Sequence, residues 1–171
     1  MIDVADRPGL AERILDAAQQ LVLQTGARKL SLTEVAKLAG VARPTLYRYF
    51  VTKDELVDAL GKRERARFAT AMADAVSNES GVARVEAAID VVAAFLGQQP
   101  PRHLIDLEPG FVNERMARVL PMIQASLAEV LHGDVAGAVA RTALSHYIFP
   151  DSDPDAARRQ LRAAAGLPPK T

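Results

Sequence analysis

The chain contains no cysteine and no tryptophan, and aromatic residues make up only 5% of its 171 residues. The lack of cysteine excludes disulfides, thiolate metal ligands and a cysteine nucleophile. Apolar runs such as Val91 to Leu96 are far shorter than the roughly 20 residues that a membrane-spanning helix needs. The first six residues include two acids and no apolar core, so they do not resemble a signal peptide. From these absences we expect a cytoplasmic protein without a membrane segment.

Histidine is scarce as well, since His103, His132 and His146 are the only side chains that ordinarily titrate near neutral pH. The sequence has no Gly-x-Ser-x-Gly elbow, no phosphate-binding glycine loop and no His-Glu-x-x-His zinc motif. His103 and Asp106 have the spacing of an oriented histidine, but such a pair is more often a detail of a helix end. We therefore expect no enzyme and no cofactor.

One segment, Asp151-Ser-Asp-Pro-Asp155, begins like a calcium-binding loop. Such a loop needs glycine at its sixth position and glutamate at its twelfth, where this chain has Ala156 and Arg162. Aspartates in this arrangement are better explained as caps of a helix. We therefore predict no metal site.

Positive charge is concentrated near the N-terminus, although the formal net charge of the whole chain is zero. Between Arg7 and Lys53 there are eight Lys or Arg against three acids, a net charge of +5. From Asp54 onward there are thirteen against sixteen, a net charge of −3. Charge fluctuates along any chain, but a basic unit on an acidic remainder is also typical of a nucleic-acid-binding domain.

Helical periodicity runs along most of the chain, with no alternating strand pattern and no internal repeat, so we predict an all-α protein. Ser31-x-x-Glu34 and Thr52-x-x-Glu55 are capping boxes that mark two helix starts. Pro121 is expected to kink or divide the helix that contains it. The expected helices are Leu10–Thr25, two short helices on either side of Gly40, Thr52–Val76, Val82–Leu96, a short helix within 102–110, Phe111–Leu131, Asp134–Phe149 capped by Asp134, and a last helix from Asp153 and Pro154 to Ala165.

The two short helices predict a helix-turn-helix, because residues at helical spacing give them facing apolar surfaces. These residues are Leu32, Val35 and Ala36 on the first helix, and Val41, Leu46 and Phe50 beyond the turn. Gly40 can take the left-handed conformation of the turn at little cost. The side chains expected to point outward are hydrogen-bond donors and flat rings that suit phosphates and base edges: Thr33, Arg43, Thr45, Tyr47, Arg48, Tyr49 and Lys53.

The pattern Ala39-Gly40-Val41, then Pro44-Thr45-Leu46-Tyr47-x-Tyr49-Phe50 and Lys53-x-x-Leu56, resembles the hallmark of the tetracycline-repressor (TetR) family of bacterial transcriptional regulators. The resemblance covers about Arg13 to Leu60. It implies a three-helix DNA-binding domain over residues 1–52, joined by a long helix to a helical regulatory, ligand-binding and dimerisation domain over residues 53–171. One departure is Ala42, a poor N-cap where the family often has serine. Arg43 or the preceding loop then takes that role, with Pro44 at the first helical position.

The first residues of the second helix of a helix-turn-helix enter the major groove. Arg43 is the best candidate for base readout, because a guanidinium can bind guanine bidentately. Pro44 offers a flat apolar contact, and Thr45 a methyl group to thymine. By resemblance, Thr33 faces the same groove.

By resemblance, Tyr47, Tyr49 and Lys53 contact phosphates, and the hydroxyl of Ser31 lies near the DNA backbone. Tyr47 has an alternative role in packing against the first helix. The remaining basic residues are either phosphate contacts or solvated surface charges: Arg28, Lys29 and Arg48.

The resemblance also implies a dimer interface on the last two long helices and a small-molecule pocket among the middle helices. Small residues at 137, 140 and 143 leave room for close helix approach, either between protomers or within one chain. The scarcity of aromatics argues against a large planar ligand, and an apolar lining suits a hydrophobic or acyl-like effector. The residues that would line the pocket, each of which is equally well explained as core, are Phe68, Met72, Phe95, Leu96, His103, Leu104, Phe111, Met116, Met122 and His146.

We therefore expect a transcriptional regulator that binds double-stranded DNA as a homodimer. Its operator is expected to be palindromic, and a small-molecule effector is expected to release it from that operator. The alternative is a helical ligand-sensing or protein-interaction module whose helix-turn-helix does not bind DNA. Activation in place of repression stays open.

Overall fold

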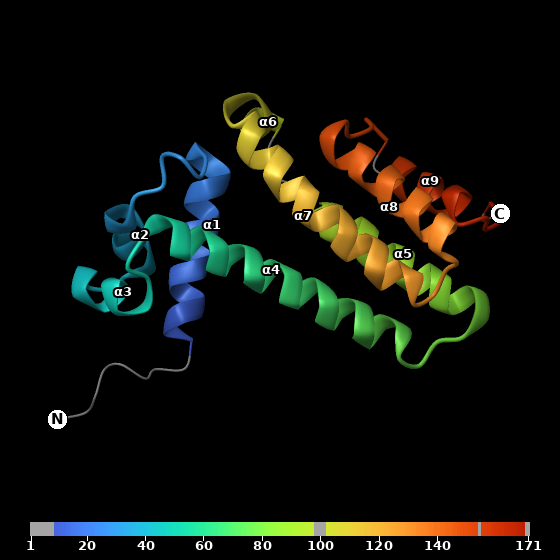
Figure 1. The fold of residues 1–171 in the computed structure, drawn as a ribbon, viewed down its shortest axis with the longest axis horizontal. Helices are drawn as coiled ribbons and strands as arrows, with labels where there is room; N and C mark the ends of the chain where they lie inside the picture. Colours follow the sequence, from blue (N-terminus) through green and yellow to red (C-terminus); the bar gives the residue numbers. More distant parts are fainter. Residues whose placement is uncertain (1–8, 98–101, 154, 170–171) are drawn as a thin grey trace. The chain divides into compact units, whose positions relative to one another are not determined.

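The computed structural model describes residues 9–97, 102–153 and 155–169, apart from the side chains of residues 102–104 (Figure 1). Every regular element in this part of the chain is a helix, as predicted. The helices are α1 (Leu10–Thr25), α2 (Leu32–Ala39), α3 (Arg43–Tyr49), α4 (Lys53–Val76), α5 (Gly81–Gly97), α6 (Arg102–Leu107), α7 (Pro109–Ala128), α8 (Gly133–Ile148) and α9 (Ala156–Ala164). No helix in the described ranges has both the length and the apolar character that crossing a membrane requires.

The chain forms two compact units, and the boundary between them falls within α4. The first unit comprises Met1–Glu64 and His103–Phe111, and the second comprises Arg65–Arg102 and Val112–Thr171. The division at residue 52 that we inferred from the sequence stays a prediction.

The first unit is held together by apolar side chains from its first four helices. Ile14 of α1, Val35 of α2, Leu46 of α3 and Leu56 of α4 are all fully buried in one cluster. Full burial of each such side chain contributes about 1.5–3 kcal/mol. Phe111, at the start of α7, also packs against this cluster. A residue far along the sequence thus completes the core of the N-terminal helices.

The second unit packs α5, α8 and α9 against one another. Its core includes Gly137, Ala140 and Ala143 of α8, which are buried within the chain. The small residues at these positions therefore serve close packing inside one chain. On the outside of this core, Arg158 of α9 pairs with Asp90 of α5 at 2.9 Å.

The predicted helix starts were correct in some places and wrong in others. The capping box at Thr52 forms, since Glu55 donates its N–H to Thr52 Oγ1 at 3.1 Å, and its carboxylate accepts from the N–H groups of Val51 (2.8 Å) and Thr52 (3.3 Å). Ser31 is the N-cap of α2, so the predicted start is correct, but its hydroxyl makes no capping hydrogen bond and the expected box contact from this side chain does not form. The backbone bond from Val35 N to Ser31 O is present at 3.0 Å.

Two further expectations concern the later helices. Helix α7 runs through Pro121 without a break, so this proline does not divide it, and the expected kink stays a prediction. Pro121 and Ala117, whose carbonyl loses its intrahelical donor, are both exposed, so water can satisfy that carbonyl. Asp134 does not cap α8, because the helix already begins at Gly133 with His132 as its N-cap.

The calcium-like segment ends at α9, which begins at Ala156 with Asp155 as its N-cap rather than at Asp153. Asp151 Oδ1 accepts from Asp153 N at 3.1 Å, and Asp153 Oδ1 accepts from Asp155 N at 2.9 Å. A hydrogen bond from Arg159 to Asp153 lowers the pKa of that carboxyl group. The carboxylates of Asp151 and Asp153 thus bind backbone N–H groups and an arginine. Pro154 lies outside the described residues.

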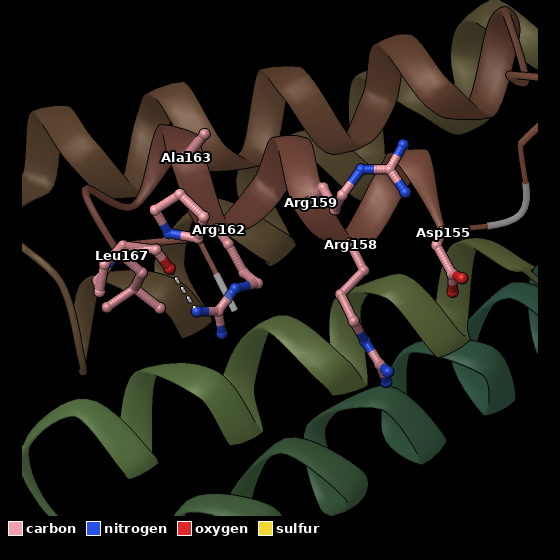
Figure 2. A pocket seen from close by; sticks show the side chains of 8 residues that line it. Asp155, Arg158, Arg159, Arg162, Ala163 and Leu167 are labelled. Atoms are coloured by element: carbon pink, nitrogen blue, oxygen red, sulfur yellow. Dashed lines mark hydrogen bonds between the residues drawn. The ribbon is translucent and has the colours of Figure 1, made fainter. Parts of the chain in front are cut away.

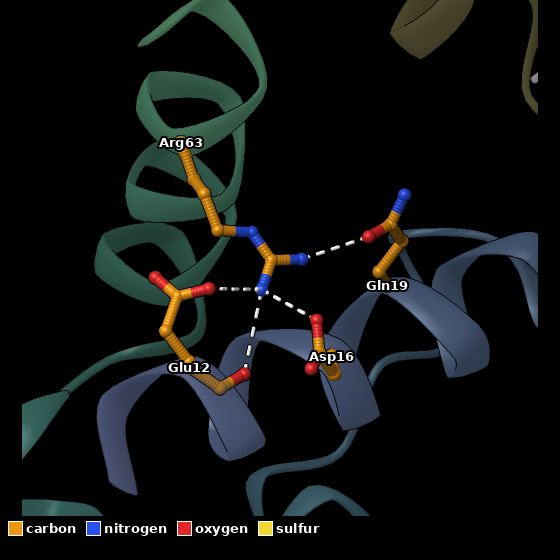
Figure 3. A network of polar contacts seen from close by, with 4 residues as sticks. All are labelled: Glu12, Asp16, Gln19 and Arg63. Carbon is orange, nitrogen blue, oxygen red and sulfur yellow. Dashed lines mark hydrogen bonds and ion pairs between the residues drawn. The ribbon is translucent and has the colours of Figure 1, made fainter. Parts of the chain in front are cut away.

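A buried arginine joins α4 to α1 inside the first unit (Figure 3). Arg63 is only 8% exposed, and its guanidinium donates to Asp16 Oδ1 (2.7 Å), Gln19 Oε1 (2.7 Å) and Glu12 Oε2 (3.2 Å). A charge removed from water is tolerated only when it is paired and hydrogen-bonded, and these contacts supply both. The guanidinium therefore fixes α4 to α1 between Glu12 and Gln19.

We expect Arg63→Ala to lower the free energy of unfolding by about 1–3 kcal/mol in urea denaturation followed by circular dichroism. The carboxylates of Glu12 and Asp16 are 52% and 61% exposed, so they stay hydrated when the guanidinium is lost. Arg63→Met keeps most of the buried volume and should lose less stability than Arg63→Ala. An Arg63→Ala variant as stable as wild type would show that the guanidinium contacts do not stabilise the first unit.

Candidate nucleic-acid interface

The turn between α2 and α3 is built on Gly40, which has a φ of +64°. The N–H of Gly40 bonds to Lys37 O at 3.2 Å, and that of Val41 bonds to Ala36 O at 2.9 Å, so the carbonyl groups at the end of α2 are satisfied. Arg13 of α1 donates from Nη2 to Ala39 O at 2.6 Å. Helix α1 thereby fixes the end of α2, from which α3 departs.

Helix α3 begins on an uncapped residue. Ala42 is the N-cap and makes no side-chain hydrogen bond, but its carbonyl accepts from Thr45 N (2.9 Å) and Leu46 N (3.1 Å). Arg43 is therefore the first helical residue and Pro44 the second, one position later than we expected. Proline is still well placed there, because the first N–H groups of a helix have no intrahelical acceptor.

The orientation of α3 is set by Leu46, which is fully buried, while Arg43, Pro44, Tyr47 and Arg48 are exposed. Thr45 is partly exposed on the same helix. The predicted outward face is therefore present in large part. Tyr47 is 46% exposed rather than packed into the core.

Tyr49 departs from the outward face that the sequence predicted. Its side chain packs against the core cluster, with its ring centroid 6.4 Å from that of Phe50. An aromatic ring at the end of a short helix gains more from burying its apolar part than from full exposure. A phosphate contact by Tyr49 stays a prediction.

Arg43 and Thr33, predicted separately as groove-facing residues, are joined in the structure. The Arg43 guanidinium donates from Nη2 to the hydroxyl of Thr33, ten residues earlier on α2. This hydrogen bond lies on the exposed surface of the unit. It restricts a flexible side chain at the very start of α3, where base readout was predicted.

Lys53 lies at the start of α4 and donates from Nζ to the backbone carbonyl of Arg28 at 3.2 Å. Arg28 and Lys29 are both exposed, in the turn between α1 and α2. Ser31, at the end of the same segment, is partly exposed. The Lys53 ammonium group thus lies against the backbone of this turn.

A buried carboxylate in the same unit was not predicted from the sequence. Glu108, between α6 and α7, accepts hydrogen bonds from the N–H groups of Ala27 (3.0 Å) and Arg28 (2.8 Å). The two partners are 81 and 80 positions away in the chain. No local pattern predicts a contact over this sequence separation. The one unusual local feature is that Glu108 directly precedes a helix that starts with proline and glycine.

The predicted effector residues are divided between the two units. Phe68, Met72, Leu96 and Met116 are buried in the second unit, where Phe95 packs its ring 4.8 Å from that of Phe68. Phe111 belongs to the first unit instead. Met122 and His146 are partly exposed, and the ring of His146 hydrogen-bonds to Gln160 at 3.1 Å. His103 and Leu104 lie outside the residues whose side chains are described.

A surface cavity of about 570 Å³ lies along α9, and Figure 2 shows three arginines at its wall. Their guanidinium groups are already paired, Arg158 with Asp90, Arg159 with Asp153 and Arg162 with Glu86. In Figure 2 the side chains of Arg158 and Arg159 extend in different directions, so they do not converge on one ligand position. None of the predicted effector residues lines this cavity.

Residues 14–60 match the family model described as bacterial regulatory proteins, tetR family. Over 57 residues the chain is 46% identical to an uncharacterized HTH-type transcriptional regulator of Mycobacterium tuberculosis. This match covers 33% of the chain and 28% of that relative, so it spans well under half the length of either protein.

Two solved structures show the same fold at low sequence identity. One is a TetR-family member from Streptomyces coelicolor, with a TM-score of 0.65 and 24% identity, covering 92% of this chain and 99% of that one. The other is the multidrug binding protein EbrR complexed with malachite green, with a TM-score of 0.66 and 23% identity over the same shares of the two chains. Residues 14–60 of this chain therefore belong to the tetR family of bacterial regulatory proteins, and the described helices have the fold of its solved members.

Proposed function

We propose that this chain is a sequence-specific DNA-binding transcriptional regulator whose α3 enters the major groove. The observation that carries the proposal is the orientation of α3, with Leu46 buried beneath it and Arg43, Pro44 and Tyr47 exposed. Helix-turn-helix proteins read bases with residues at the start of this helix. Lys53, Tyr47 and Arg48 then bind phosphates on either side, with Ser31 and Tyr49 as further phosphate contacts.

We further propose that two copies bind a palindromic operator, because each chain carries one reading helix and dimers of such proteins recognise two half-sites. The copies associate through the outer faces of the last helices, since the small residues of α8 are already buried within the chain. The regulator acts as a repressor that a small molecule releases from its operator.

Selection of bound sequences from a random duplex pool tests this function directly. We expect enrichment of an inverted repeat whose half-sites are about one helical turn, or a multiple of it, apart. A pool that stays unenriched, together with no salt-dependent affinity for any duplex, would instead support the alternative of a ligand-sensing module with a helix-turn-helix that does not bind DNA.

Arg43→Ala should weaken binding to the selected operator by about 1–3 kcal/mol and relax the preference at one base pair per half-site. Thr33→Val, which keeps the shape of the side chain but removes the acceptor hydroxyl, should reduce the same preference less strongly. Fluorescence anisotropy on a set of single-base operator variants measures both effects. An unchanged base preference in the Arg43→Ala variant would show that Arg43 does not read a base.

Lys53→Ala should weaken binding to all duplexes by a similar factor. The dependence of log affinity on log salt should become shallower by about one unit, because each phosphate contact releases about one counterion. Titrations at several salt concentrations, on the operator and on a scrambled duplex, give the two slopes. A loss confined to the operator would show that Lys53 reads sequence rather than phosphate.

We propose a hydrophobic or acyl-like effector for the second unit, in contact with Phe68, Met72, Phe95, Leu96 and Met116. The support is the apolar character of these mostly buried side chains. The complex of the similarly folded EbrR with malachite green supports a small-molecule site in this fold, but not the chemical class of the effector. A ligand present at 100 times its dissociation constant stabilises the folded state by about 2.7 kcal/mol.

Medium-chain fatty acids should therefore raise the melting temperature and release a fluorescent operator duplex, whereas amino acids and sugar phosphates should do neither. Thermal shift and anisotropy on the same ligand panel check both effects. Stabilisation by polar, charged ligands alone would contradict a hydrophobic effector.

A further inference from the structure

Glu108 is a buried acidic residue that contacts the segment between Arg7 and Lys53, whose net charge is +5. It stands between α6 and α7 and is only 6% exposed. Its two carboxylate oxygens accept from two successive backbone N–H groups, Ala27 N at 3.0 Å and Arg28 N at 2.8 Å. Such charge-assisted bonds are about twice as strong as neutral ones. They give acceptors to the backbone N–H groups of the turn that follows α1.

Gly26 shows independently that this turn is shaped around the carboxylate. Its φ is +88°, which side chains of L-residues rarely adopt, and a Cβ atom placed on it would lie 2.5 Å from Glu108 Oε1. The carboxylate therefore occupies the space that any side chain at position 26 would need.

The backbone of Arg28 connects this carboxylate to a proposed DNA contact. The N–H of Arg28 donates to Glu108 Oε1, and the carbonyl of Arg28 accepts from Lys53 Nζ at 3.2 Å. Fixing the backbone of residues 27 and 28 thus fixes the point from which the Arg28 side chain projects and the acceptor that holds the Lys53 ammonium group.

We propose that Glu108 is a positioning residue for DNA binding, which acts through the turn at 27–28 on Arg28 and Lys53. This inference rests on the proposed DNA-binding function. It means that the α6–α7 junction contributes to DNA binding, although this junction lies far beyond the helix-turn-helix in sequence.

The proposed positioning role and simple electrostatics predict opposite changes in DNA affinity when Glu108 is replaced. DNA is a polyanion, so removing a carboxylate beside a basic segment should strengthen binding. If Glu108 positions Arg28 and Lys53, its removal should weaken binding instead. The direction of the effect therefore separates the two explanations.

The test compares Glu108→Gln and Glu108→Ala in the full chain with a matched control, Glu114→Gln. Glu114 is an exposed glutamate on α7, so its substitution changes the net charge equally without touching the turn. The probes are the selected operator duplex and a scrambled duplex of the same length. We expect Glu108→Ala to weaken binding about tenfold, the size of one lost charge-assisted contact, and the control to bind as well as wild type or slightly better.

A double-mutant cycle with Lys53→Ala distinguishes positioning from a loss of overall structure. Glu108→Ala should lower the salt slope by about one unit. In the Lys53→Ala background it should weaken binding less than in wild type, because part of its effect runs through Lys53. Glu108→Gln keeps the size of the side chain and one acceptor oxygen, so it should fall between wild type and Glu108→Ala.

Hydrogen exchange of the amides of residues 27 and 28, measured by NMR without DNA, should be faster in both Glu108 variants. If wild type binds DNA and the Glu108 variants match the Glu114 control, or if the cycle shows no coupling, the positioning role is overturned while the proposed function stands. If wild type binds no duplex at any salt concentration, the proposed function itself fails and the positioning role with it. The exchange data then still report whether Glu108 holds the turn.

Discussion

Burial of Leu46 beneath α3 is the constraint on which the arrangement of the helix-turn-helix depends. Helix α3 has seven residues, begins at an uncapped alanine and has a proline in its first turn. A helix this short is not stable alone in water, where about 12–15 residues are needed even for favourable sequences. Its shape and direction must therefore come from packing, and Leu46 is the one residue of α3 that is fully buried. Its polar neighbours are exposed because Leu46 points inward.

Charged side chains then fix this apolar unit through hydrogen bonds between segments that are distant in the sequence. Arg13 donates to the last carbonyl of α2, Arg63 donates to three side chains along α1, and Glu108 accepts from the turn after α1. Each contact joins segments that are at least 26 positions apart in the chain. Apolar burial gives the unit most of its stability, whereas these bonds select one geometry among several that bury similar area.

Local patterns in the sequence were enough to predict the first four helices, α1 to α4. The spacing of Ile14, Ala18 and Val22, followed by Gly26, predicts the bounds of α1 correctly, and the box at Thr52 predicts the start of α4. Both signals depend only on residues within a few positions of one another. The box at Ser31 also predicts the start of α2, but its hydroxyl makes no capping hydrogen bond, since a capping pattern permits such a bond and does not require it.

What the sequence could not reveal was which polar residues are buried. Arg63 and Glu108 look like ordinary surface charges, because nothing within four residues of either one marks its distant partners. Tyr49 was assigned outward on the same local reasoning, yet its ring lies against a core that α1 and α7 help to build. Burial of such residues is decided by tertiary contacts, which helical periodicity does not encode.

The close approach at Gly26 has an evolutionary consequence. Because an oxygen of Glu108 fills the volume of the missing Cβ, the two positions cannot drift independently. A larger residue at 26 would be strained by the positive φ in any background, and with the acid at 108 present it would also clash. Relatives that retain this acid in the same architecture should therefore keep glycine at 26, and engineered chimaeras that exchange the first 64 residues without the partner segment should lose the contact between the two positions.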